Sequence, residues 1–296
     1  DRYASRGLGD VYKRQLHVDG DDPFIIAVAV GAKGKIYRIN GPTIHEIKSV
    51  YPHPLKEMHF IDGLRGYLAG DYYTLRYTED GGESWQVVLP KEGFGDGVPL
   101  IKALHARGDT TAFVAGENRY MARAGKRVAT KEGITVNGVR GNISFNDIAF
   151  TGDGIGFAVG GSGKTGDEGY GFISSDKGEN WQLIGSPITG AQFTSLHVFD
   201  NNNTFMAAGN VSTLSAPRVV YYNGQTPSLQ QSTFQPPTGN APSEIGEDIQ
   251  LYDIYFLDNL TGYIAGSDGT LFKSEAGIMD GGNRLSSLSW QRKSLR

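Results

Sequence analysis

Histidines and carboxylates recur at fixed positions in short apolar segments of this sequence. The middle of each segment is occupied in turn by His17, His59, His105, Ala149, His197 and Tyr255. Two residues earlier, from the second segment on, stand Glu57, Ala103, Asp147, Ser195 and Asp253. Neutral imidazoles bind transition metals and protonated ones bind anions, while paired carboxylates can hydrolyse glycosides. The candidate polar site therefore comprises Glu57, His59, His105, Asp147, His197, Asp253 and Tyr255.

The neighbours of these polar residues predict β-strands. Apolar side chains such as Met58 and Phe60 flank each middle position, so that apolar and polar residues alternate. Because successive side chains of a strand point to opposite faces, both polar sets should share one face. One interpretation is repeat heritage, with polar groups lining a water-filled channel or bonding to the next repeat. The other is a site for a small ligand, an anion or a metal. We assign no catalytic residue, metal or cofactor to these positions.

A longer repeat surrounds each polar strand. A second apolar run follows and ends in glycine, at Gly31, Gly70, Gly116, Gly160, Gly209 and Gly266, with intervals of 39, 46, 44, 49 and 57 residues. A third run, a turn and a fourth run come next, and five of the six turns carry a hairpin signal such as Asn-Gly or Asp-Gly. Four strands in about 45 residues are typical of a β-propeller blade.

Two of these turns share a motif with a clear physical role. It comprises Thr78, Asp80, Gly82 and Trp85 in one repeat, and Ser174, Asp176, Gly178 and Trp181 in another. The hydroxyl and the carboxylate can accept hydrogen bonds from turn N–H groups, and the tryptophan can cover the turn. We predict that these residues are structural. The motif resembles the Asp-box, or bacterial neuraminidase repeat, of many β-propellers.

The wider pattern, x-G-[YF]-x-A-G followed by Y-T-x-D-G-G-x-S-W, resembles the photosystem II assembly-factor-like propellers. The resemblance covers about residues 16–296. It implies an all-β propeller of four-stranded antiparallel blades, and its photosynthetic members are assembly chaperones. The same superfamily includes sialidases and some endoglucanases. Sialidases carry an Arg-Ile-Pro signature, whereas Arg38-Ile39 is followed here by Asn40, which argues against that activity.

The ends of the repeat array bear on domain organisation. Asp1 to Gln15 fits no repeat and resembles adapter read-through in assembled environmental sequence, so we treat it as non-native or disordered. We expect residues 16–296 to form one propeller that is truncated at its start. Six blades are visible and seven are expected in the intact protein; a closed ring of six is the alternative. The segments 162–169 and 235–248 are expected to be long surface loops.

Composition limits the possible partners. The net charge is -4 without a basic run, which makes nucleic acid an unexpected partner. No stretch approaches the roughly 20 apolar residues of a membrane span. The absence of cysteine excludes disulfides and thiolate chemistry. We expect an exported, monomeric, non-enzymatic scaffold that binds a protein or a glycan. The alternative is a glycoside hydrolase that uses Glu57, Asp147 or Asp253.

Overall fold

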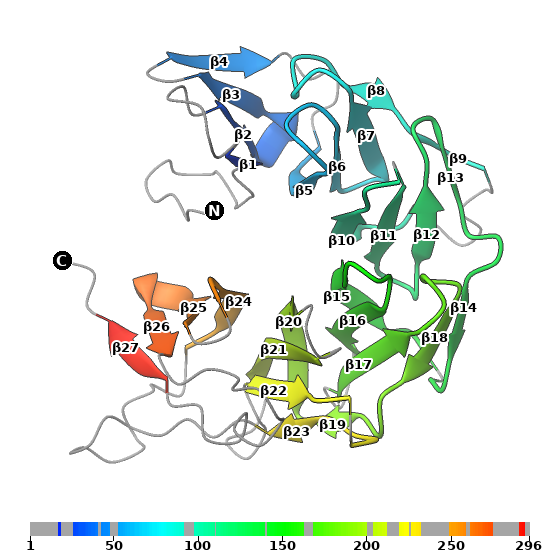
Figure 1. The fold of residues 1–296 in the computed structure, drawn as a ribbon, viewed down its shortest axis with the longest axis vertical. Coiled ribbons are helices and arrows are strands. Elements are labelled where there is room, and N and C mark those ends of the chain that lie inside the picture. Colours follow the sequence, from blue (N-terminus) through cyan, green and yellow to red (C-terminus); the bar gives the residue numbers. More distant parts are fainter. Residues whose placement is uncertain are drawn as a thin grey trace. The chain divides into compact units, whose positions relative to one another are not determined.

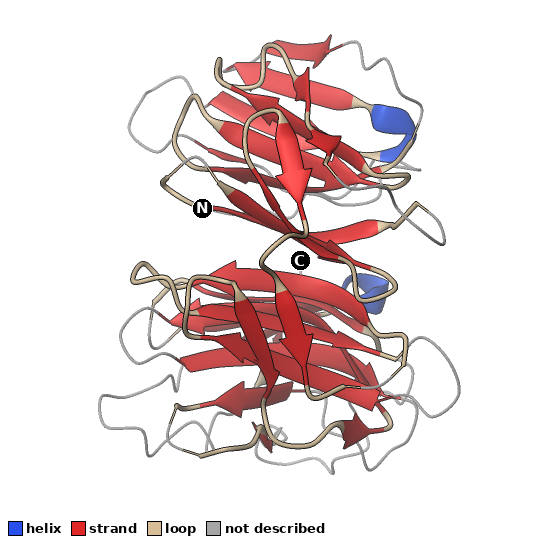
Figure 2. Cartoon of the chain, turned by 90° about the vertical axis from the view of Figure 1, so that its right-hand side faces the viewer, coloured by secondary structure: helices blue, strands red, loops and turns tan. Residues whose placement is uncertain are grey.

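A computed structural model shows an all-β chain in which the described helical segments are two short 3-10 turns, η1 (Ala32–Gly34) and η3 (Ser267–Gly269) (Figure 2). The structure describes residues 17–18, 26–40, 43–47, 53–91, 98–109, 111–139, 141–162, 168–199, 204–211, 219–224, 226–231, 249–258, 261–274 and 290–293. The segments 1–15 and 235–248 and residues 163–167 lie outside this part of the chain, and the loop expected at 162–169 ends earlier because β17 begins at Glu168. Two units are distinguished, Asp1–Ile134 and Thr135–Arg296, and each is described by itself.

The first unit contains three sheets in which strands that follow each other in the sequence pair antiparallel (Figure 1). Sheet one has the order β1 (His17–Val18), β2 (Ile26–Val30), β3 (Ile36–Asn40) and β4 (Thr43–Ile47). Sheet two has the order β5 (Leu55–Phe60), β6 (Gly66–Gly70), β7 (Thr74–Thr78) and β8 (Gln86–Val87). Sheet three consists of β10 (Ile101–Ala106), β11 (Ala112–Gly116), β12 (Met121–Ala124) and β13 (Val128–Thr130), with β9 (Leu89–Pro90) added at its outer edge.

The second unit repeats this arrangement. Sheet four runs from β15 (Ser144–Phe150) through β16 (Gly156–Gly161), β17 (Glu168–Ser174) and β18 (Asn180–Leu183) to β14 (Thr135–Asn137), and β19 (Ile188–Thr189) also pairs with β17. Sheet five has the order β20 (Ala191–Phe199), β21 (Thr204–Val211), β22 (Val219–Tyr222) and β23 (Gln230–Gln231). Sheet six has the order β24 (Leu251–Phe256), β25 (Gly262–Gly266), β26 (Leu271–Ser274) and β27 (Gln291–Lys293).

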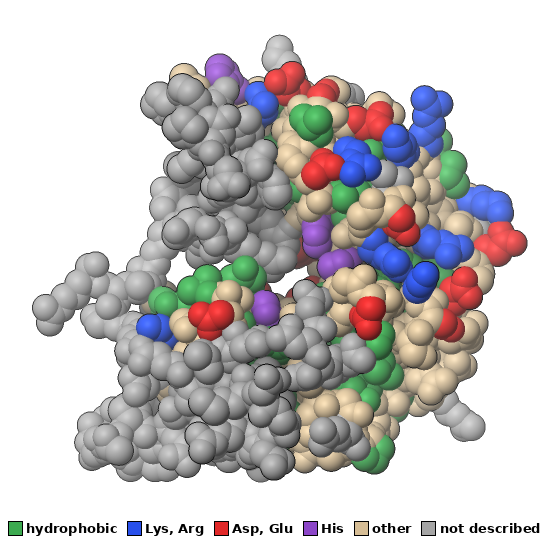
Figure 3. Space-filling model, in the orientation of Figure 1, with side chains coloured by type: hydrophobic (Ala, Val, Ile, Leu, Met, Phe, Trp, Pro, Cys, Tyr) green, Lys and Arg blue, Asp and Glu red, His purple; other side chains and the backbone are tan. Residues whose placement is uncertain are grey.

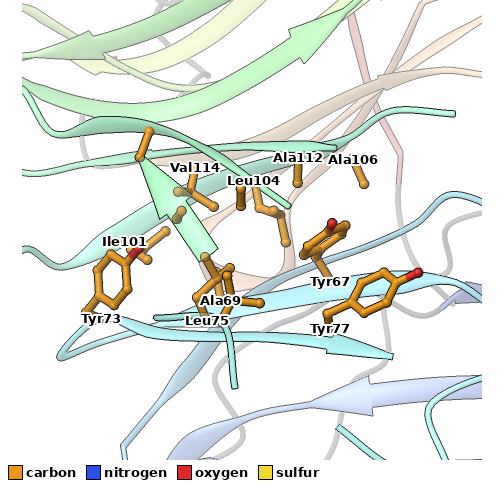
Figure 4. Packing of buried hydrophobic residues seen from close by; sticks show 14 of the residues in the cluster. Tyr67, Ala69, Tyr73, Leu75, Tyr77, Ile101, Leu104, Ala106, Ala112 and Val114 are labelled. Carbon is orange, nitrogen blue, oxygen red and sulfur yellow. The ribbon is translucent and has the colours of Figure 1, made fainter. Parts of the chain in front are cut away.

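The apolar core lies between successive sheets of a unit. Between sheets two and three, Leu75 and Tyr77 of β7 join Leu104 of β10 and Val114 of β11 in one buried cluster (Figure 4). Corresponding clusters join sheets one and two, sheets four and five, and sheets five and six. Each sheet therefore buries a face against its neighbour, as the alternating apolar pattern requires.

The repeated glycines allow the close approach of two backbone segments. A Cβ atom on Gly70 would lie 2.1 Å from the carbonyl oxygen of Pro54, and one on Gly160 would lie 1.9 Å from that of Ser144. Gly116, Gly209 and Gly266 meet a carbonyl oxygen in the same way. The recurrent glycine at the end of the second strand thus follows from packing rather than from a turn.

The expected fourth strand of sheet two differs in one respect from the sequence prediction. The fourth run of this repeat spans residues 84–89, but β8 ends at Val87 and pairs with β7, whereas β9 begins at Leu89 and pairs in parallel with β13 of sheet three. Between them Val88 is buried and its N–H donates to the carbonyl of Leu75 at 3.0 Å. The run is therefore divided after Val88: residues up to Val88 bond to β7 of sheet two, and Leu89 bonds to sheet three.

Candidate functional site

The candidate polar residues all lie on the first strand of a sheet. Glu57 and His59 lie on β5, His105 on β10, Asp147 on β15, His197 on β20, and Asp253 and Tyr255 on β24. These side chains are half-buried, whereas the residues between them, such as Met58 and Ile254, are buried. The alternation expected from the sequence is therefore present on these strands. The strand position of His17 is described but its side chain is not.

An irregularity recurs at the same position in five first strands. The pairing register shifts immediately before Glu57, Ala103, Asp147, Ser195 and Asp253. Each shift places one extra residue in the first strand, and such bulges redirect side chains. These bulges were not among the features predicted from the sequence.

The extra residues have definite partners. Lys56 and Lys102 form ion pairs with Asp71 and Glu117 at the end of the second strand of their own sheets. In the second unit, the Asn146 amide donates to the carbonyl of Phe193 at 2.8 Å, and the Thr194 hydroxyl donates to that of Leu251 at 2.9 Å. The bulge thus presents polar side chains that bind the backbone of the following sheet in the second unit.

In the first unit, the structure brings two of the predicted histidines together. The imidazole rings of His59 and His105 have centroids 4.5 Å apart and lie edge to face at 74°. They come from neighbouring sheets, on β5 and β10, at equivalent repeat positions. Within the described residues no group of three histidine, cysteine, aspartate or glutamate side chains is placed to hold a metal ion.

In the second unit, Ser195 links two of the predicted carboxylates. Its hydroxyl oxygen lies 3.1 Å from Oδ2 of Asp147 and 2.7 Å from Oδ1 of Asp253. A hydroxyl has a single proton, so it donates to one carboxylate at a time. Asp147 also accepts hydrogen bonds from the N–H groups of Ile148 and Leu196, at 2.8 Å and 2.9 Å.

These contacts connect the edge strands of successive sheets. The strands β15, β20 and β24 are each the edge of their own sheet. The N–H of Leu196 on β20 is bound by Asp147 on β15, and the N–H of Ile254 on β24 reaches the Ser195 hydroxyl on β20 at 3.4 Å. The two acceptors and the two donors occupy equivalent repeat positions. The polar residues therefore provide acceptors for backbone groups that an edge strand leaves without a sheet partner.

His197 acts in the same way one step further along its strand. Its Nδ1 atom accepts a hydrogen bond from the N–H of Phe256 at 3.4 Å, and its ring meets that of Tyr255 edge to face at 5.2 Å. An Nδ1 atom that accepts a hydrogen bond carries no proton, so this contact requires a neutral imidazole with its proton on Nε2. In this unit, bonding to the next repeat accounts for Asp147, Ser195 and His197.

The two turns with the shared motif have the same hydrogen bonds. The N–H of Gly82 donates to Thr78 Oγ1 at 3.0 Å, and that of Gly178 donates to Ser174 Oγ at 2.9 Å. The carboxylates accept from the N–H groups of Ser84 and Asn180, at 2.9 Å and 2.8 Å. The positive φ angles lie at Gly81 and Gly82 in one turn, and at Lys177 and Gly178 in the other.

Each motif tryptophan closes its turn. The indole N–H groups of Trp85 and Trp181 donate to the carbonyls of Gly82 and Gly178, at 3.2 Å and 3.0 Å. Trp85 lies edge to face against Phe60, and Trp181 against Phe150. Trp290 packs on Phe256 in the same geometry, at a centroid distance of 5.8 Å. Sheet six thus has the same tryptophan contact.

The carboxylates of these turns are held in their charged form. Hydrogen bonds from the N–H and the amide of Asn180 are the main reason that the pKa of Asp176 is lowered. Burial alone would raise the pKa of Asp80, but hydrogen bonds from Ser84 and Thr78 outweigh it and lower the pKa. Both shifts follow from turn stabilisation and require no ligand.

Comparison with solved structures shows the fold. The structure titled "YCF48 bound to D1 peptide" has a TM-score of 0.59 at 15% identity, covering 90% of this chain and 78% of that one. YCF48 from Cyanidioschyzon merolae has a TM-score of 0.64 at 14% identity, covering 95% and 84%. The GH74 enzyme of Niastella koreensis has a TM-score of 0.61 at 12% identity, covering 90% of this chain and 44% of the enzyme.

These neighbours are β-propellers, so the likeness confirms an all-β fold of propeller type. The sequence matches no protein-family model and none of the curated proteins with which it was compared. In the described part of the chain, no helix has the length and hydropathy needed to cross a membrane.

On the face drawn in Figure 3, basic side chains lie among acidic ones. Ion pairs such as Arg38–Glu83 and Lys126–Glu79 join basic and acidic side chains.

Proposed function

We propose that this chain is a non-enzymatic propeller scaffold that binds a protein partner through a peptide segment. The observation that carries this proposal is the likeness to the structure of YCF48 bound to a D1 peptide, over 90% of this chain. A rigid repeat frame that presents turns and loops at its ends is suited to such recognition. We also propose that the six sheets are propeller blades and that the two shared turns are Asp-boxes.

The arrangement of the carboxylates supports this choice over a glycoside hydrolase. Hydrolysis by two carboxylates requires room between them for the glycosidic bond or a water. Here the Ser195 hydroxyl lies between Asp147 and Asp253, in hydrogen-bond contact with both. Asp147 is further occupied by two backbone N–H groups. The likeness to a GH74 enzyme, at 12% identity, concerns the fold.

The test combines a binding screen and a turnover screen on the full chain. An array of short peptides would be probed for binding, and a panel of oligosaccharides and polysaccharides for hydrolysis. We expect saturable binding to a subset of peptides and no turnover. Hydrolysis that disappears in Glu57→Gln, Asp147→Asn or Asp253→Asn would overturn the proposal and make the protein an enzyme. Binding of glycans without any peptide would replace the protein partner by a carbohydrate.

A further inference from the structure

The turn between the second and third strands is left-handed in several sheets. In sheet one it places Lys33 and Gly34 at φ of 58° and 68°, and in sheet three it places Asn118 and Arg119 at 56° and 58°. Sheet six has Gly269 there, at 67°. Glycine and asparagine tolerate this region best, whereas bulky residues adopt it at a cost in free energy. In sheet two the turn consists of Tyr72 and Tyr73, at φ of 51° and 54°.

Burial accounts for only one of these tyrosines. Tyr73 is 9% exposed and belongs to the same buried cluster as Ile101 (Figure 4). It also lies edge to face against Tyr120, with ring centroids 5.8 Å apart. Tyr72, in contrast, is 62% exposed. The free-energy cost of its positive φ angle is therefore not offset by burial of the ring, and core packing does not explain a tyrosine at this position.

The exposed ring of Tyr72 is nevertheless held in place. The imidazole of His53 lies against it, with centroids 4.3 Å apart and planes inclined by 36°. The turn is fixed by Thr74, whose N–H and hydroxyl donate to the carbonyl of Asp71, at 3.1 Å and 2.8 Å. The N–H of Asp71 donates to the carbonyl of Pro54, next to His53, at 3.0 Å. Hydrogen bonds therefore fix the two backbone segments that carry these rings.

Strained backbone that the surrounding structure maintains is typical of binding sites. Exposed tyrosines that lose little conformational entropy are common anchors of protein interfaces. We propose that Tyr72 and His53 form a stacking platform for a proline or aromatic side chain of the peptide partner. This inference rests on the proposed function and locates its contact. Aromatic surfaces of this kind are how extended, proline-containing peptides are recognised in other folds.

The surroundings favour a peptide side chain over a sugar. A sugar ring that stacks on an aromatic residue also needs polar groups to bind its hydroxyls. The carboxylate adjacent to the platform, that of Asp71, is engaged in the ion pair with Lys56. A proline or aromatic ring needs only the apolar face, which the platform supplies.

The test uses the full chain and an array of short peptides that differ only at a central residue, with proline, tryptophan, tyrosine, leucine, serine or aspartate there. The central variant is Tyr72→Asn, because asparagine suits the left-handed turn. Leu64→Ala is the control for exposed apolar area, since Leu64 is 61% exposed between β5 and β6 of the same sheet. Lys33→Asn is the control for strain relief, since it makes the same change to asparagine in the equivalent turn of sheet one without removing a ring.

We expect proline- or aromatic-centred peptides to bind the unchanged chain best. Tyr72→Asn should weaken them about tenfold or more and raise the Tm by about 2 °C as strain is relieved. Both controls should bind the peptides as the unchanged chain does.

Unchanged peptide affinity in Tyr72→Asn would overturn the platform but leave the proposed function standing. A lower Tm would make Tyr72 a structural residue and overturn the inference. If no peptide binds the unchanged chain, both proposals fall, and an oligosaccharide lost in Tyr72→Asn would assign the platform to glycans.

Discussion

At the scale of single residues, the same motif is used with different degrees of burial. Trp181 is fully buried, whereas Trp85 is partly exposed although its indole makes the same hydrogen bond. Trp290 also reaches a fully buried position next to Phe256. The aromatic contact with the first strand thus recurs in all three sheets.

The turn carboxylates should make stability depend on acid. Because the pKa of Asp176 is lowered by folding, the unfolded chain binds its proton more readily, and stability falls as pH decreases below the ordinary value of 3.8. Above that pH the contribution is fully present. We expect Asp176→Ala to lower the free energy of unfolding by about 1–2 kcal/mol near neutral pH.

Urea unfolding at pH 7 and at a pH near 3 would measure this contribution. The difference between the variant and the unchanged chain should shrink at the lower pH. Glu179→Ala serves as the control, because Glu179 is exposed in the same turn and its carboxylate is not part of the motif. An equal loss of stability at both pH values would show that the charge of Asp176 has no role.

At the scale of elements, strand order and repeat length were predictable, but strand ends and bulges were not. The repeated glycines and the alternation around His59 and Asp147 predicted the first two strands of each sheet, since both features depend on local sequence. The division at Val88 depends on its burial and on its hydrogen bond to the carbonyl of Leu75, and the register shifts depend on the neighbouring strand. Neither contact has a local signature. The role of Ser195 was missed because serine differs from the carboxylates at equivalent positions.

The glycine at the end of the second strand should tolerate no side chain. In Gly160→Ala, the new Cβ atom would lie 1.9 Å from the carbonyl oxygen of Ser144, so the backbone of Ser144 would have to move. We expect a loss of about 2–4 kcal/mol, larger than ordinary overpacking because backbone has to move. Gly152→Ala is the control, since nothing lies within 4 Å of its Cβ. Chemical denaturation would compare them, and equal stabilities would refute the close-approach explanation.

The link between sheets four and five should depend on the acceptor at Asp147. In Asp147→Ala the N–H of Leu196 loses its side-chain acceptor, so we expect a loss of about 2–3 kcal/mol in the free energy of unfolding. Ser195→Ala should cost less, because Asp147 keeps its two backbone N–H donors. A double-mutant cycle would measure the coupling between the two positions. Additive effects would mean that the hydrogen bond between them contributes nothing.

At the scale of the whole molecule, sheets two, three and four become less buried from the second strand to the outermost one. Every residue of β6, β11 and β16 is buried, whereas both residues of β8 are exposed. The all-β class and the propeller type followed from the repeat alone. The identity of the partner did not follow, because the long loops expected at 162–169 and 235–248 contain no recognisable sequence motif.

Hydrogen exchange should reveal this gradient in both units. Amide groups of β6, β11 and β16 are expected to exchange slowest, and those of β8 and β14 fastest, because exposed strands open without unfolding the core. Mass spectrometry of proteolytic peptides after timed labelling would separate these strands. Equal protection of the second and outermost strands would indicate that each sheet opens only as a whole.

The handover of a strand between sheets has a consequence for how such an array can grow by gene duplication. Sheets three and four each take an outer strand, β9 or β14, that precedes their own first strand in the sequence. A duplicated segment that starts at Ile101 would supply four strands and leave the new sheet without its outer member. One that starts at Leu89 would supply all five. A segment that carries a whole sheet in this part of the chain therefore begins where the preceding sheet ends.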